Sequence, residues 1–365
     1  MAIGSRMSDN IQLTRRECLV RGAGAVVATV AAAAGGYLLY DSSGRRGLVG
    51  DAGKTPVPHT LKDFFAGIDF PAASPRISVA MGEEPRIESM LRAAIGGLDP
   101  SLGMRRFIRP GDVVLIKPNA GFDRPPYLGA TTHPEVLRAV IRLCREAGAR
   151  EVLVTDHPIE SPAACFAKSG IGPVVEAEGA RLIVPREDQF GPVHSGAGPL
   201  DRWPVFYEPL ERATKLVGIA PVKDHNLCSA SMNLKNWYGL LGGRRNQLHQ
   251  AIHEVISDLA LLFSPTLVIA DATRVMMRSG PTGGRLSDVR PGGELGRPAV
   301  VAAVDPVACD AWCYENLLGR DAAQLAYLGR AVEKIRADVA SGAQRFGSSD
   351  WHAYEHEGKI IRANV

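Results

Sequence analysis

The chain has 365 residues, enough for one large domain or two modest ones. Hydrophobic residues make up 45% of it and charged residues 22%, a composition typical of folded rather than disordered proteins. A formal net charge of only +3, without an arginine-rich stripe, argues against a nucleic-acid partner, and six cysteines do not indicate a disulfide-stapled scaffold.

Residues 1–41 have the features of a targeting segment. Residues 14–21 (TRRECLVR) precede an uncharged stretch at 22–40, and together they resemble a twin-arginine translocation signal. The resemblance implies export of a folded chain by the twin-arginine machinery, to the periplasm or to the outer side of the cytoplasmic membrane. The alternatives are a membrane anchor, since about 18 apolar residues can span a bilayer, and a signal that is never cleaved.

Residues 42–75 are rich in Gly, Pro and Ser and predict a linker with a short helical piece at 61–65. Beyond this linker, apolar runs and helical periodicity alternate along a single predicted domain at 76–365. Strands are expected at 76–81, 113–118, 151–155, 181–184, 214–220, 266–270, 298–304 and 359–362. Helices are expected at 84–98, 132–147, 163–178, 249–263, 305–318 and 321–340.

This order predicts an α/β fold with a mostly parallel, doubly wound sheet and helices on both faces. The run at 113–118 (VVLIKP) is almost continuously apolar, as expected of a parallel strand buried on both sides. Two helix starts are also marked. Thr132 with Glu135 forms a predicted capping box, and Asp305 before Pro306 forms a predicted N-cap.

Polar residues gather where the predicted strands end. The stretch at 221–243 (PVKDHNLCSASMNLKNWYGLLGG) is the densest concentration, and an apolar strand leads into it. Ligands of open α/β sheets bind at the carboxyl ends of the strands. The residues expected at those ends are Lys117, Asn119, Asp156, His157, Lys223 and His225.

Several short motifs, in order between about 112 and 319, resemble the family called Domain of Unknown Function 362. They are 115–119 (LIKPN), 132–136 (THPEV), 223–225 (KDH), 234–239 (LKNWYG), Asp271, 280–281 (GP) and 305–310 (DPVACD). Some members of this family carry ferredoxin-like cysteine clusters and are described as iron–sulfur proteins. No C-x-x-C-x-x-C run occurs in this sequence, so no separate ferredoxin module is expected.

The cysteines suggest a metal centre. Cys309 and Cys313 are spaced i, i+4 on one predicted helix face, and Cys228 lies in the polar stretch. With Cys165 or His225 as a fourth ligand, they could hold an iron–sulfur cluster or a zinc ion. The alternative is that these thiols are small buried apolar groups and that no metal is bound.

A cationic set suggests a second kind of site, for a small anion. Its members are Lys117, Lys223, His225, Lys235, Arg244 and Arg245. Asn119, Asp156 and Asn236 are further candidate ligand-binding residues, and Asp271, directly after a predicted strand, is a candidate for orienting a lysine. His249 and His253 are expected at the surface or an interface.

Three functional hypotheses follow. The first is an exported redox or metal protein, with an iron–sulfur cluster held by Cys228, Cys309, Cys313 and Cys165. The second is an enzyme or binding protein for a small anion, with Lys223, His225, Lys235 and Asp271 as catalytic residues. The third is a non-catalytic assembly factor.

Overall fold

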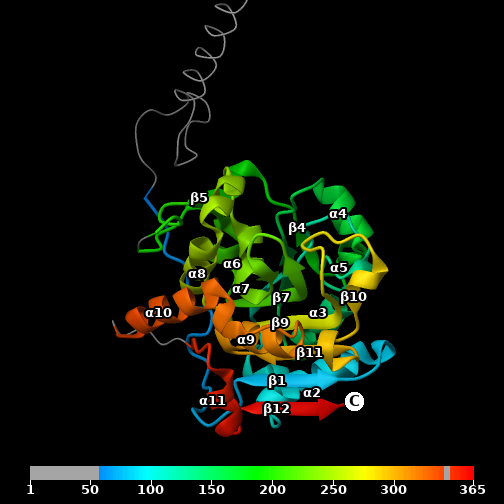
Figure 1. Ribbon diagram of the computed structural model, residues 1–365. Helices are drawn as coiled ribbons and strands as arrows, with labels where there is room; N and C mark the ends of the chain where they lie inside the picture. The colour runs from blue at the N-terminus through cyan, green and yellow to red at the C-terminus, as the bar shows by residue number, and fades with distance from the viewer. Residues whose placement is uncertain (1–56, 197, 341–345) are drawn as a thin grey trace, which may run out of the picture. The chain divides into compact units, whose positions relative to one another are not determined.

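The computed structural model describes residues 57–365 except 197 and 341–345 (Figure 1). The predicted translocation signal and the first part of the expected linker lie outside the described residues. Within the described part, residues from 57 to 75 pack onto the sheet domain instead of standing apart as a linker. Phe64 is buried in the main core, and a turn replaces the helical piece expected at 61–65.

The described residues form a ten-stranded mixed sheet in the order β12-β1-β11-β9-β7-β2-β3-β4, with β8 paired to β7 and β10 to β9. Its central neighbours β9, β7, β2, β3 and β4 are all parallel, whereas β11 runs opposite to β9 and β1. The strands are β1 (Ile77–Met81), β2 (Val113–Lys117), β3 (Glu151–Thr155), β4 (Arg181–Ile183), β7 (Lys215–His225), β8 (Ser229–Ser231), β9 (Leu267–Met276), β10 (Val289–Arg290), β11 (Ala299–Ala303) and β12 (Ile360–Asn364). A separate ribbon pairs β5 (Phe190–Pro192) with β6 (Pro204–Phe206).

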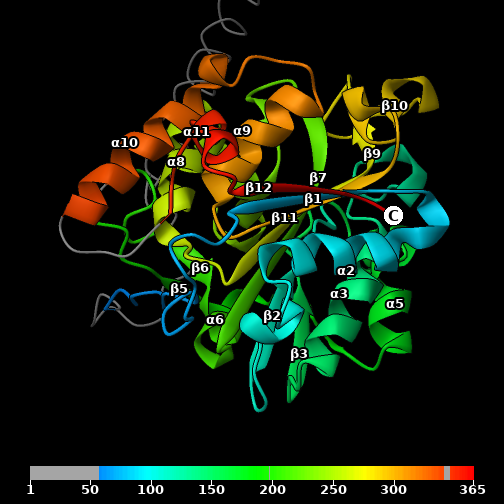
Figure 2. The ribbon, with the colours of Figure 1, turned by 90° about the horizontal axis from the view of Figure 1, so that it is seen from below.

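Helices cover both faces of the sheet, which confirms the predicted α/β class (Figure 2). The α-helices are α2 (Ile87–Leu98), α3 (Pro134–Glu146), α4 (Pro162–Lys168), α5 (Ile171–Ala177), α6 (Tyr207–Arg212), α7 (Asn233–Asn236), α8 (Ile252–Leu262), α9 (Pro306–Asn316), α10 (Ala326–Ala340) and α11 (Trp351–His356). Side chains alternate along β2, so Leu115 contributes to the core under α8 and α9, and Ile116 to the core under α2 and α3. Figure 2 shows α2, α3 and α5 on one side and α8, α9 and α10 on the other.

Helix ends account for two differences from the sequence-based expectations and confirm a third expectation. His133, not Thr132, caps α3 through its Nδ1, because the Thr132 hydroxyl is bonded to Asn119 N and Ile219 O. The helix expected at 163–178 is two helices, because Gly170 takes a left-handed conformation with φ of 75°. The predicted cap at Asp305 is confirmed, since its carboxylate accepts from two backbone N–H groups of α9.

Two strands run further than expected. β7 continues to His225, so the first residues of the polar stretch are strand rather than loop. β9 continues to Met276 and places Asp271 inside the strand. The strands extend because β8 pairs with the end of β7, and β10 with the end of β9.

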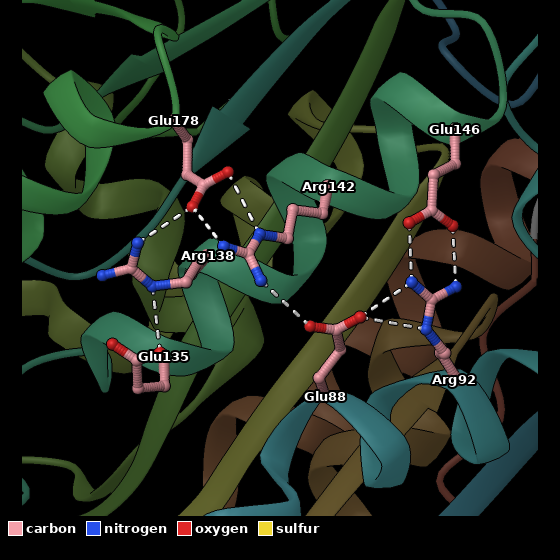
Figure 3. A network of polar contacts seen from close by, with 7 residues as sticks. All are labelled: Glu88, Arg92, Glu135, Arg138, Arg142, Glu146 and Glu178. Atoms are coloured by element: carbon pink, nitrogen blue, oxygen red, sulfur yellow. Dashed lines mark hydrogen bonds and ion pairs between the residues drawn. The ribbon is translucent and has the colours of Figure 1, made fainter.

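An ion-pair network ties α2 to α3 and to the end of α5 (Figure 3). Arg92 bridges Glu88 and Glu146 at 2.8 and 2.6 Å, and Arg142 bridges Glu88 and Glu178 at 3.3 and 2.9 Å. Most of these side chains are partly exposed, so each pair contributes little, although the shared partners make the set a network.

None of the helices in the described part of the chain is both long and apolar enough to span a membrane.

Candidate functional site

A cavity of about 280 Å³ lies at the carboxyl ends of β2, β3 and β7. It brings together most of the candidate residues, although they come from four separate segments of the sequence. The candidates that line it are Lys117, Asn119, Asp156, Lys223, His225, Lys235, Asn236 and Arg245. The sequence-based expectation that these strand ends converge is therefore met for the cationic set, apart from Arg244, and for its amide partners.

Lys117, at the end of β2, makes a buried ion pair. Its Nζ lies 2.7 Å from Asp156 Oδ1, and the two side chains are only 1% and 2% exposed. The same nitrogen donates to Pro118 O at 2.7 Å and to Asn236 Oδ1 at 2.8 Å. Three acceptors match the three N–H groups of an ammonium. Burial lowers the pKa of Lys117, and the Asp156 carboxylate opposes that shift.

Asn236, on α7, is held in a fixed orientation. Its Nδ2 donates to the carbonyl oxygens of Lys117 and Ile219, at 3.1 and 3.2 Å. Its Oδ1 therefore faces the Lys117 ammonium and also accepts from Asn119 Nδ2 at 3.2 Å. The two asparagines predicted to bind a ligand thus connect the β2 end to α7.

Buried Asp310 of α9 anchors the start of α7. Its carboxylate accepts from the backbone N–H groups of Asn233 and Leu234, both at 2.9 Å. Burial raises the pKa of Asp310 to about 7. Because α7 carries Lys235 and Asn236, Asp310 is a positioning residue for the cavity, and it lies outside the cavity wall.

Lys223 lies near the end of β7 and is only 1% exposed. Its Nζ donates to Ala130 O at 2.5 Å and to Asn119 Oδ1 at 3.4 Å, and lies 5.0 Å from the centroid of the Phe122 ring. Burial lowers the pKa of Lys223 to about 7, and the neighbouring cation Lys235 adds to the shift.

Lys235 and Arg245 bring two further cations to the cavity. The Lys235 Nζ lies 5.1 Å from the centroid of the Tyr238 ring, and no hydrogen bond or ion pair joins it to another described residue. Arg245 donates to Pro158 O at 2.8 Å. Burial lowers the pKa of both groups. Arg244, in contrast, is exposed and does not line the cavity.

Two of the imidazoles in the wall, those of His225 and His157, are neutral, and each leaves Nε2 free. His225 Nδ1 accepts from Leu227 N at 3.1 Å, which leaves Nε2 protonated. Burial, followed by Lys235 and Lys223, lowers the pKa of His225 to about 2. His157 Nδ1 lies 3.0 Å from Leu241 O, so it is the protonated nitrogen and Nε2 is the acceptor; burial again lowers the pKa. These two side chains thus offer the cavity an uncharged hydrogen-bond donor, His225 Nε2, and an uncharged acceptor, His157 Nε2.

Asp271, predicted as a catalytic residue, does not line the cavity. One carboxylate oxygen accepts from His133 N at 2.7 Å, and the other accepts from the backbone and hydroxyl of Thr273. These bonds hold the start of α3 against β9. The structure therefore gives Asp271 a supporting role, because its acceptors are used within the fold.

The four cysteines predicted as metal ligands are all buried. Cys228 donates to Ala230 O at 3.2 Å, and burial raises its pKa, and that of Cys165, to about 11. A hydrogen bond from Cys313, together with burial, raises the pKa of Cys309. In the absence of a metal, these environments favour the protonated thiols of Cys165, Cys228 and Cys309.

Within residues 57–365, apart from the gaps, no three His, Cys, Asp or Glu side chains are arranged to hold a metal ion. The cysteines thus do not fit an iron–sulfur cluster or zinc ion in this arrangement. Ligation of a metal by these cysteines stays a prediction, because the described residues do not form a site for it.

The sequence did not single out three residues of the cavity wall. They are Phe122, Tyr238 and His249. His249, expected at the surface or an interface, lies 3.2 Å from the Tyr238 hydroxyl through its Nδ1. Tyr238 belongs to a recognised motif, but nothing in its local sequence marks the ring as a cation partner of Lys235.

The fold and the cavity define an α/β protein with a cation-lined site at the carboxyl edge of its sheet. The family model described as "Domain of unknown function (DUF362)" matches residues 114–315, more than half of the chain, so the chain belongs to that family. The thylakoid-associated protein sll1697 of Synechocystis sp. (strain ATCC 27184 / PCC 6803 / Kazusa) is 25% identical over 242 residues, 64% of this chain and 73% of that protein. All the cavity residues described above lie within the family match.

Proposed function

We propose that this protein binds a small anionic molecule in the cavity, either as an enzyme or as a binding protein. The charge of the cavity wall carries this proposal. Among the described residues, Lys117, Lys223, Lys235 and Arg245 line the cavity and Asp156 is the one carboxylate, already paired with Lys117. An anion would supply the missing counter-charge for Lys235 and Arg245 in a site where burial strengthens electrostatic attraction.

Lys235 gives the sharpest test, because within the described part of the chain its ammonium makes no hydrogen bond or ion pair, so its removal leaves no hydrogen-bonding group unsatisfied. We expect inorganic phosphate or pyruvate, at constant ionic strength, to raise the melting temperature of the full chain. In Lys235→Met the affinity measured by calorimetry should fall at least about tenfold, equivalent to about 1.4 kcal/mol. Arg244→Met removes the same charge from an exposed position outside the cavity wall and should bind like the wild type.

Two results would contradict the proposal. The first is that neither phosphate nor pyruvate binds the wild type. The second is that Lys235→Met binds as tightly as Arg244→Met, because binding would then take place elsewhere on the surface.

For the location of the protein, we propose export through the twin-arginine route, supported by Arg15-Arg16 and the uncharged run at 22–40. In a bacterial host, the full chain should fractionate outside the cytoplasm. The double variant Arg15→Lys, Arg16→Lys keeps the charge and should stay in the cytoplasm. Equal distribution of the two proteins between the fractions would refute export by this route.

A further inference from the structure

Two buried lysines of the cavity differ in the number of acceptors that reach the amino group. Lys117 Nζ contacts three acceptors, and one of them is a carboxylate. Lys223 Nζ contacts two, the Ala130 carbonyl oxygen at 2.5 Å and Asn119 Oδ1 at 3.4 Å. No carboxylate among the described residues forms an ion pair with Lys223.

This difference matters because an ammonium has three N–H groups and a neutral amine has two. The surroundings of Lys117 therefore suit the charged form. Those of Lys223 satisfy both N–H groups of a neutral amine and leave its lone pair free for a molecule in the cavity.

The electrostatic surroundings of Lys223 favour the same form. Burial is the main cause that lowers its pKa, and the cations Lys235 and Lys117 add to it. Asp156 and Cys228 act in the opposite direction without cancelling the shift. A desolvated lysine beside other cations is a typical amine nucleophile toward carbonyl groups.

We propose that Lys223 Nζ forms an imine with an aldehyde or ketone group of the small anion, so that the substrate class is an oxo acid or another anionic carbonyl compound. The nitrogen lone pair forms the bond to the carbonyl carbon. Both N–H protons of the amine pass to the former carbonyl oxygen, which leaves as water. This inference rests on the proposed function, because Lys235 and Arg245 are the groups that would hold the anionic end.

Reductive trapping tests the imine directly. The full chain is incubated at pH 7 with glyoxylate or pyruvate and sodium cyanoborohydride, and the adducts are located by peptide mass mapping. We expect about one adduct per chain, at Lys223, with Lys117 unmodified. Exposed Lys168 should react far more slowly, since it lies outside the cavity that would hold the anionic carbonyl compound and is paired with Asp123 at 3.6 Å.

Two controls separate this inference from simple anion binding. Excess lactate, an anion without a carbonyl group, should slow the trapping by competing for the cavity. Lys223→Arg should lose the dominant adduct but still bind phosphate, since Lys235 and Arg245, which would hold the anion, are unchanged. If this variant does not fold, the peptide mass map of the wild-type protein still tests the imine, because it shows whether the adduct is at Lys223.

The possible failures are distinguishable. If phosphate and pyruvate bind but adducts spread evenly over exposed lysines or are absent, the imine is refuted and the anion site stands. If neither anion binds and no adduct forms at Lys223, both proposals fail together.

Discussion

Replacing Asp156 with alanine is expected to lower the free energy of unfolding by about 3–5 kcal/mol, as is typical when one partner of a buried ion pair is removed. The Lys117 ammonium would remain almost fully buried without its counter-ion. Asp156 Oδ2 also accepts from Ala120 N at 2.6 Å, so a buried N–H would lose its partner. Urea unfolding at pH 7 measures the loss.

The double variant Asp156→Ala, Lys117→Met is the matched control. It removes the stranded charge and should recover much of the stability, because a buried pair contributes little relative to an apolar replacement. Asp188→Ala breaks an exposed pair with Arg186 and should change stability far less. If the double variant were as unstable as Asp156→Ala, the uncompensated charge of Lys117 would not be the cause.

The loss of folding stability in Asp156→Ala should also depend on pH. Without the carboxylate, burial would hold the pKa of Lys117 still further below the ordinary lysine value. The unfolded chain then binds more protons than the folded one, so the stability of the variant rises with pH up to about 10.5. We therefore expect its deficit relative to the wild type to shrink between pH 7 and pH 10.

Gly239→Ala is expected to disrupt the same ion pair by steric means. A Cβ at Gly239 would lie 2.0 Å from Asp156 Oδ1 and 2.7 Å from Lys117 Nζ. Both side chains would have to move, at a cost of about 1–3 kcal/mol, as is typical of overpacking. Because they form the cavity wall, we also expect phosphate affinity to fall at least about tenfold, measured by calorimetry.

Gly329→Ala is the control for this substitution. Gly329 lies in α10, and a Cβ there would meet no atom within 4 Å. The change should raise stability slightly, since alanine favours the helix, and should leave phosphate binding unchanged. Wild-type binding by Gly239→Ala would mean that the Lys117–Asp156 pair can move freely without affecting the site.

The sequence predicted the fold class and the convergence of the strand ends because those signals are local. The apolar run before Lys117 indicates a parallel strand, and a polar residue directly after such a strand must lie at the sheet edge. The roles of individual residues depended on contacts between distant segments. Asp271 resembled a strand-end ligand, but pairing between β9 and β10 continues the strand beyond it. In addition, His133 N donates a hydrogen bond to one of its carboxylate oxygens.

The cysteines show why spacing alone was insufficient. Cys309 and Cys313 do share a helix face, yet that face belongs to the main core, where the hydrogen bond with Cys313 and burial raise the pKa of Cys309. The Lys223 environment was equally invisible in the sequence. The acceptors of Lys223 Nζ, on Ala130 and Asn119, come from the segment between β2 and α3. Only the folded chain shows that this amino group has two acceptors, whereas that of Lys117 has three.

The position of β1 in the sheet has a consequence for the order of events during synthesis. β1 is the first strand of the sheet to leave the ribosome, but its two neighbours are β11 and β12, both more than 200 residues later in the chain. Ile77 and Val79 therefore have no strand partner while the cavity strands β2, β3 and β7 can already assemble. The nascent protein carries an unpaired apolar edge for most of its translation, which is the kind of segment that chaperones cover.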